Sequence, residues 1–217
     1  MTFYQYPDYM YHYGVKGMKW GVRKAYNTSG VRLHSKTMKK GYEFQNISKD
    51  NRARKISNEN ALYVSHKPSD NKTYRNMYWW FGDQPVKNTI TAKKDVRIAG
   101  KSVSQREFVK MCAKNGKAIA DDMGNQKYDF SSNKSLAAKA KGARWVKNEG
   151  YKDFVRQYTE GMGSTHQEFN KRMNKKGYDA IYDIYDIAGG YSKEPLIFFS
   201  PNDSVKVSKS ERYKYDK

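Results

Sequence analysis

The chain of 217 residues has few side chains suited to acid–base, nucleophilic or metal chemistry, and they are widely spread. Asp179, Asp183 and Asp186 form the tightest group, and carboxylates at such short spacing could ligate a hard cation through oxygen. No histidine or cysteine lies near them, so we interpret them as solvated faces and turn caps and expect no metal. The four histidines have no ligand spacing: His12, His34, His66 and His166.

Two single residues also have chemical potential. Cys112 lies in the apolar-periodic run 108–112, which is typical of a core helix face and not of a nucleophile. A lone cysteine excludes an intramolecular disulfide, which suits a reducing compartment. Glu194 directly precedes the apolar run 195–199, and its simplest interpretation is a carboxylate in the turn before a buried strand. The sequence has neither a Walker-type loop nor a dinucleotide-binding glycine pattern.

The charge balance favours polyanionic partners. The chain has 42 Lys and Arg against 22 Asp and Glu, a formal net charge of +20. Such a field attracts nucleic acid, or an acidic capsid interior that holds it. Residues 1–40 contain eight basic residues and only Asp8 as an acid, so they contribute +7. A solvated basic surface without a dedicated partner is the alternative interpretation.

Size and hydropathy predict one domain with a tail. The mean hydropathy of −1.03 is polar for a globular chain, but aromatic residues make up 15% and include 19 tyrosines, which argues against general disorder. No apolar run approaches the roughly 18 residues of a membrane span, and the N-terminus lacks the apolar region of a signal peptide. We therefore expect no membrane partner.

The elements that must position these residues follow the order strands, helices, strands. Alternating or short apolar runs predict strands at 42–47, 61–65, 86–92, 95–99, 178–183, 195–199 and 204–207. Helical spacing predicts helices at 71–80, 104–122, 135–148, 151–159 and 164–175, with capping by Ser104 and Ser164. This order is typical of an α+β domain with a central helical segment. We expect a domain over residues 41–208, between an extended basic tail at 1–40 and a loose basic end at 209–217.

The N-terminal segment 12–23 reads as a docking peptide. Its glycines weaken a helix, so regular structure there would need a partner surface. Met18 and Trp20 supply apolar anchors, and charge comes from Lys16, Lys19 and Arg23. A flexible solvated tail is the alternative. The string H-x-G-V-K-G-M-K-W-G-V-R resembles a short motif of head and other structural proteins in tailed phages and prophages of Gram-positive bacteria.

The domain resembles a divergent ADP-ribosyltransferase of the kind found in phage head proteins and bacterial toxins. The likeness is carried by Gly41–Ser48, by Leu62–Ser65 with Asp70 and Tyr74, by Lys94–Ala99, and by Lys176–Asp183 with Glu194–Phe199. The resemblance implies an ADP-ribosyltransferase-like β core. It also implies that Glu194 is the catalytic glutamate, that Ser65 braces an NAD site, and that Tyr74 lies on the helix behind it.

Transfer from NAD needs a cation on the diphosphate and a carboxylate at the ribose as the bond to nicotinamide breaks. In the family an arginine meets the first need, but here Asn46 or its neighbour Gln45 stands at the matching place. An amide carries no charge, and compensation would have to come from Arg52 or Arg54. Ser192 replaces the Glu or Gln that toxins commonly place two residues before the glutamate. NAD is therefore a cofactor only if the chain is active.

These observations favour a virion-associated minor capsid or head protein, assembled in the host cytoplasm, with a degenerate ADP-ribosyltransferase-like domain docked through its basic N-terminal motif. Its partners would be capsid or head proteins, and the number of copies per particle stays open. One alternative is an active mono-ADP-ribosyltransferase delivered by the phage. Another is a non-specific nucleic-acid-binding protein that uses its charge and exposed tyrosines.

Overall fold

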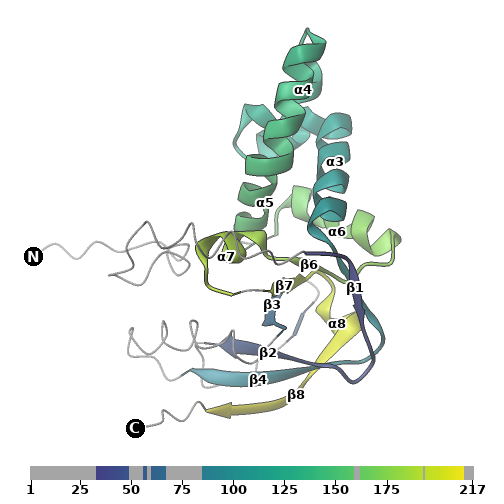
Figure 1. Ribbon diagram of the computed structural model, residues 1–217, viewed down its shortest axis with the longest axis vertical. Helices are drawn as coiled ribbons and strands as arrows, with labels where there is room; N and C mark the ends of the chain where they lie inside the picture. Colours follow the sequence, from purple (N-terminus) through teal and green to yellow (C-terminus); the bar gives the residue numbers. More distant parts are fainter. Residues whose placement is uncertain are drawn as a thin grey trace, which may run out of the picture.

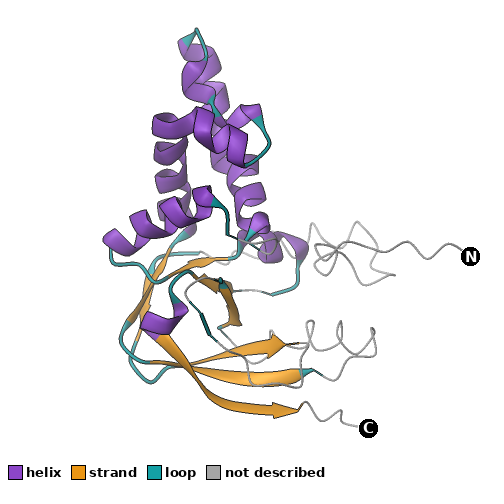
Figure 2. Cartoon of the chain, turned by 180° about the vertical axis from the view of Figure 1, so that it is seen from behind, coloured by secondary structure: helices purple, strands orange, loops and turns teal. Residues whose placement is uncertain are grey.

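The computed structural model describes residues 33–48, 56–57, 60–66, 85–158, 162–192 and 194–212. These residues form a mixed α+β structure in which an eight-stranded sheet lies below a column of helices (Figure 1). Seen from behind, the longer helices all gather on the same side of the sheet (Figure 2). The predicted α+β class and central helical segment are confirmed for this part of the chain.

The sheet is predominantly antiparallel. Its strands are β1 (Lys36–Met38), β2 (Glu43–Ser48), β3 (Leu62–Ser65), β4 (Val86–Ala92), β5 (Val96–Ala99), β6 (Ala180–Tyr182), β7 (Pro195–Phe198) and β8 (Val205–Arg212). Their order is β1-β5-β6-β7-β3-β2-β4-β8. Only β5 and β6 run parallel, and the helical segment between them supplies the long crossover that parallel strands require.

Side-chain alternation explains why these segments are strands. In β4 the even-numbered positions 86–92 are buried and the odd-numbered ones are half-exposed, the period of two that places one face against a core. The strands expected at 42–47, 61–65, 86–92 and 95–99 are confirmed as β2, β3, β4 and β5. Those expected at 178–183 and 195–199 are confirmed as β6 and β7, each shorter than predicted.

Both ends of the sheet correct the expected boundaries. Strand β1 lies inside the segment assigned to the tail, where it pairs antiparallel with β5 through Lys36 and Ile98. Strand β8 continues to Arg212 through seven residue pairings with β4, so residues 209–212 are part of the sheet and not a loose end. The strand expected at 204–207 is confirmed as the start of β8. Strand β1 and the second half of β8 have exposed positions and little apolar character, which is why their sequences are typical of polar ends.

The helices are α3 (Lys101–Asp122), α4 (Leu136–Trp145), α5 (Tyr151–Gln157), α6 (Ser164–Lys175), α7 (Ile184–Gly189) and α8 (Pro201–Ser204). All but the short α8, which lies at the sheet, gather in a separate layer (Figure 1). Two 3-10 turns, Gln126–Tyr128 and Phe130–Ser132, join α3 to α4, and a π turn at Val146–Gly150 joins α4 to α5. The helix expected at 71–80 lies outside the described residues.

Two predicted helix starts are wrong. Helix α3 begins at Lys101 after Gly100, so Ser104 lies within its first turn and donates back to the Lys101 carbonyl instead of capping. Glu107, the expected partner in that capping box, is buried and lies near Lys110 and Lys176. Helix α6 likewise follows Gly163, and Ser164 is its first residue. The sequence contains the capping pattern, but each helix begins directly after a glycine. For α3 this is Gly100, which directly follows β5, and for α6 it is Gly163.

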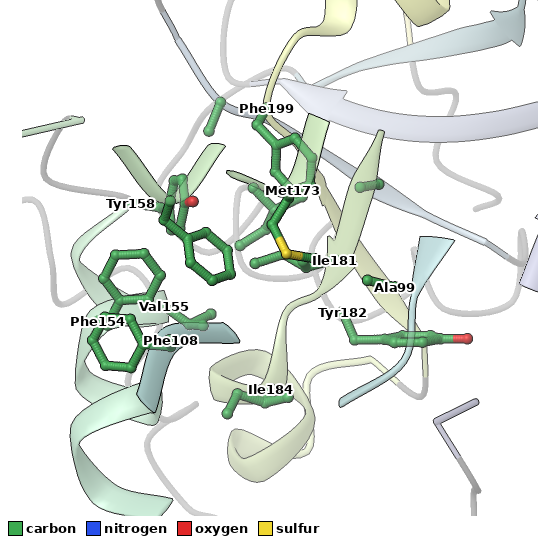
Figure 3. Close-up of a cluster of buried hydrophobic side chains, with 14 of the residues drawn as sticks. Ala99, Phe108, Phe154, Val155, Tyr158, Met173, Ile181, Tyr182, Ile184 and Phe199 are labelled. Carbon is green, nitrogen blue, oxygen red and sulfur yellow. The ribbon is translucent and has the colours of Figure 1, made fainter. Parts of the chain in front are cut away.

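An aromatic cluster joins the helices to the sheet. The Phe108 ring lies 4.4 Å from Phe154, and Phe154 lies 5.0 Å from Phe169, centroid to centroid. Figure 3 shows Phe108 and Phe154 on the side of β6 toward which Ile181 points, while Tyr182 extends to the other side of that strand. The alternation of a strand thus sends one residue into the core and the next toward the region around Glu194.

Candidate functional site

Three of the residues expected at an NAD site lie on adjacent strands. Asn46 is on β2, Ser65 ends β3, and Glu194 directly precedes β7. Ser65 pairs with Gln45 across one side and with Pro195 across the other. The pairing brings these segments, far apart in sequence, to one end of the sheet. The remaining expected site residues lie outside the described residues: Lys16, Met18, Lys19, Trp20, Arg23 and Tyr74.

The Glu194 carboxylate is engaged by two basic side chains. Its Oε2 atom lies 2.6 Å from Lys36 Nζ, an ion pair with hydrogen-bond geometry, and 3.6 Å from His66 Nε2. Lys36 reaches it from β1 while its ammonium lies 5.4 Å from the centre of the Tyr182 ring. The three side chains are mostly buried. We call Glu194, Lys36, His66, Tyr42 and Tyr182 the Glu194 cluster.

Two tyrosines flank the carboxylate. The Tyr42 hydroxyl lies 2.9 Å from His66 Nδ1 and donates to the His66 carbonyl at 3.1 Å, and the two rings stack. The Tyr182 hydroxyl donates to the His34 carbonyl. Burial, with the negative charge of Glu194 as a smaller cause, raises the pKa of Tyr42 and raises that of Tyr182 to about 12. Both phenols therefore stay neutral and act as hydrogen-bonding groups near neutral pH.

Asn46 is part of an interstrand hydrogen-bond network. Its amide nitrogen donates to the Tyr63 carbonyl at 2.8 Å, and its carbonyl oxygen accepts from Asn88 at 3.2 Å. Asn88 also donates to Ser48 and accepts from Ser210. The buried Asn46 amide thus finds its partners within the sheet and links three neighbouring strands, β3, β2 and β4. Its place and lack of charge do not suit a diphosphate clamp, so the residues present do not fit the phosphates of NAD at this position.

The late carboxylates have structural roles. Asp179, Asp183 and Asp186 are all buried, which corrects the expected solvated faces. Asp183 caps α7, because its Oδ1 accepts from the backbone of Tyr185 and Asp186, so the expected turn cap is confirmed there. Asp179 accepts from the Arg97 backbone and pairs with Lys94. Throughout the described ranges no group of three His, Cys, Asp or Glu residues is arranged to hold a metal ion.

Four members of the Glu194 cluster were missed from the sequence. His66 directly follows Ser65, and Tyr182 ends the strand with the late motif, so both could have been found as neighbours of matched residues. Tyr42 carries the same kind of signal, since it opens the first matched segment. Lys36 gives no signal, because it lies in a polar stretch and reaches Glu194 across 158 residues of sequence.

Comparison with known proteins adds one short match. Residues 4–27 match the model of a family described as a family of unknown function, DUF7211. This range contains the whole segment 12–23 and covers a small part of the chain. No curated protein and no solved structure matches the chain. None of the described helices combines the length and apolarity needed to cross a bilayer.

Proposed function

We propose that this chain is a virion-associated protein of a tailed phage or prophage, whose ADP-ribosyltransferase-like domain serves a structural or binding role and is docked by its N-terminal segment. The observation that best supports a domain without ADP-ribosyltransferase activity is the contact of the Glu194 carboxylate with Lys36 and His66. Assembly in the host cytoplasm and residence in the virion follow from this proposal.

The ion pair opposes a catalytic role for Glu194. A transferase glutamate must accept a hydrogen bond from the ribose and oppose positive charge that develops at the sugar. Here the Lys36 ammonium already neutralises the carboxylate at 2.6 Å. A sugar hydroxyl would have to displace a charged donor, which makes the stronger hydrogen bond. The carboxylate thus supports the local structure between β1 and β7.

The environment of Asn46 supports the same conclusion. The family arginine would offer several charged donors to a diphosphate. The Asn46 amide is neutral, and its nitrogen is held by the Tyr63 carbonyl inside the sheet. The Asn46 side chain therefore belongs to the strand network and offers no charge to a diphosphate, which supports a domain without transferase activity.

Docking rests on the segment 12–23 and its resemblance to phage head proteins. The family match over residues 4–27 supports treating this segment as a unit distinct from the sheet and helices that follow. Copurification with capsids from infected or induced cells tests the idea. We expect Trp20→Ala to abolish it, while Tyr26→Ala, an aromatic change in the same terminal region but outside the motif, leaves it intact. Normal packaging of the Trp20→Ala protein would overturn the docking role.

An active mono-ADP-ribosyltransferase is the second candidate, because Glu194, Ser65 and His66 meet at one end of β3 and β7. Incubation with labelled NAD and host lysate separates the two. Our proposal expects no label transfer by the native chain. Transfer that is lost in Glu194→Ala and kept in Glu168→Ala, a change of an exposed carboxylate on α6, would establish the enzyme instead.

A further inference from the structure

We infer that the outward face of α4 is a binding surface for the phosphate backbone of double-stranded DNA. The inference is independent of the proposed virion role, since it rests on the charge, exposure and shape of this helix. α4 lies at the end of the helical column farthest from the sheet in both views (Figure 1, Figure 2). It contributes no buried residue to the core.

The charged side chains of α4 are all of one sign. Between Phe130 and Asn148 the sequence has no Asp or Glu. The same stretch has five basic residues, all exposed: Lys134, Lys139, Lys141, Arg144 and Lys147. No ion pair joins any of the five to another residue in the part of the chain that the structure describes. Their charge is therefore directed at solvent and is available to a polyanion.

The helix has an inner and an outer face. Gly142 lies on the inner face, where an added Cβ would overlap Phe130, so the missing side chain lets α4 pack closely on the preceding turn. Trp145 also lies inward, with its ring against Tyr128 and under the Lys127 ammonium. Ala140, about 160° around the axis from Gly142, lies on the exposed face.

Basic side chains flank a narrow outer strip. Lys139 and Arg144 lie about 140° apart around the helix axis, with Ala140 between them. The strip between them carries Ala140 and Leu136, the latter 86% exposed, and no charged side chain. The B-form major groove, about 12 Å wide, admits an α-helix. Long basic side chains on both sides of the strip then reach the phosphates that border the groove.

Duplex DNA fits this face better than other polyanions. The only aromatic residue of α4 is the inward Trp145, so the helix has no platform for stacking the bases of a single strand. The A-form major groove is too deep and narrow for side chains to read. The outer strip has no amide or hydroxyl side chain to read base edges, so we expect binding without sequence preference.

Salt-dependent binding of the full chain to a random-sequence duplex tests the inference. The probe is fluorescein-labelled DNA of about 30 base pairs, followed by anisotropy from about 50 to 200 mM KCl. For Lys139→Ala/Lys141→Ala/Arg144→Ala we expect a salt slope smaller by about 2.7, because each lost phosphate contact removes about 0.9. The dissociation constant should rise at least tenfold, while alanine preserves the helix.

A matched variant controls for net charge. Lys171→Ala/Lys175→Ala/Lys206→Ala removes three exposed charges from α6 and β8, and we expect its affinity to stay within twofold of the native chain. Equal weakening by the two triple variants would reduce the effect to overall charge and overturn the proposal. An unchanged α4 variant would also overturn it and would place DNA binding elsewhere.

Two further arms keep the result specific. A charge-retaining variant is Lys139→Arg/Lys141→Arg/Arg144→Lys, and we expect it to bind the duplex as the native chain does. Weakened binding by this variant would show that positive charge on α4 is not what binds the duplex. Polyaspartate and phosphatidylserine vesicles test an acidic protein or membrane. If polyaspartate or the vesicles bind the triple-alanine α4 variant less tightly than the native chain, to the same degree as the duplex does, the assignment to DNA is wrong.

Discussion

The ion pair between Lys36 and Glu194 should couple the first strand to the end of β7, and a double-mutant cycle measures this. The variants are Lys36→Met, which keeps the length of the side chain, Glu194→Gln, which keeps its shape, and the double substitution. Lys36 Nζ lies 2.6 Å from Glu194 Oε2, and the Lys36 and Glu194 side chains are 26% and 20% exposed. The pair therefore lies between the exposed and the fully buried regimes.

The magnitude follows from that intermediate burial. Exposed pairs contribute about 0.2–1 kcal/mol, and removing one partner from a buried pair costs about 3–5 kcal/mol. We expect a coupling free energy of about 1–2 kcal/mol between Lys36 and Glu194, interpolated between those limits. The single variants should then melt roughly 2–8 °C below the native chain, at about 2–4 °C per kcal/mol for this size.

Urea unfolding of the four proteins at neutral pH, followed by circular dichroism, gives the cycle. The coupling should persist at high salt, because partly buried pairs are screened less than exposed ones. A coupling below about 0.3 kcal/mol would match an ordinary exposed pair. That result would refute the argument that Lys36 holds Glu194, and with it the main support for loss of transferase activity.

Three other outcomes follow from the described side chains. The free energy of unfolding should fall as pH drops below about 6.5. Burial lowers the pKa of His166, so the unfolded chain binds a proton that the folded chain does not. His166→Phe should flatten this part of the curve of stability against pH, and an unchanged slope would exclude His166 as its source. Asp183→Ala should cost about 1 kcal/mol in urea unfolding through loss of the α7 cap, whereas an unchanged midpoint would show that the cap adds nothing. The Cys112 thiol, buried and with its pKa raised to about 12, should react with a disulfide reagent only after unfolding; prompt reaction in the native state would contradict its place in the core.

Strand positions could be predicted from the sequence where alternation and burial coincide. Val86–Ala92 alternates buried and half-exposed positions because one face covers the core, and the pattern was sufficient to locate β4. Strand β1 and the polar second half of β8 gave no such pattern, whereas the start of β8 was predicted as the strand at 204–207. Their structure comes from hydrogen bonds to a neighbouring strand that is distant in sequence.

The candidate site was predictable only in part. Glu194 and Ser65 were identified through the resemblance, and strand pairing brings them together. Asn46 was expected at the phosphate clamp, but its side chain is held by hydrogen bonds to Tyr63 and Asn88. These partners lie on neighbouring strands, and no local sequence pattern indicates that they come close to Asn46. The role of Asp179 was similarly decided by a partner on another segment, whereas Asp183 caps the helix that directly follows it, which is a local arrangement.

The sequence by itself determined the α+β class, most strand positions, the helical segment between β5 and β6, and the surplus of positive charge. These depend on composition and on periodicities of neighbouring residues, which are local properties. Only the tertiary structure decided that Lys36 would neutralise Glu194 and that the basic face of α4 would project from the molecule. Both depend on which distant segments meet, because an ion pair or an exposed face exists only once the packing around it is complete.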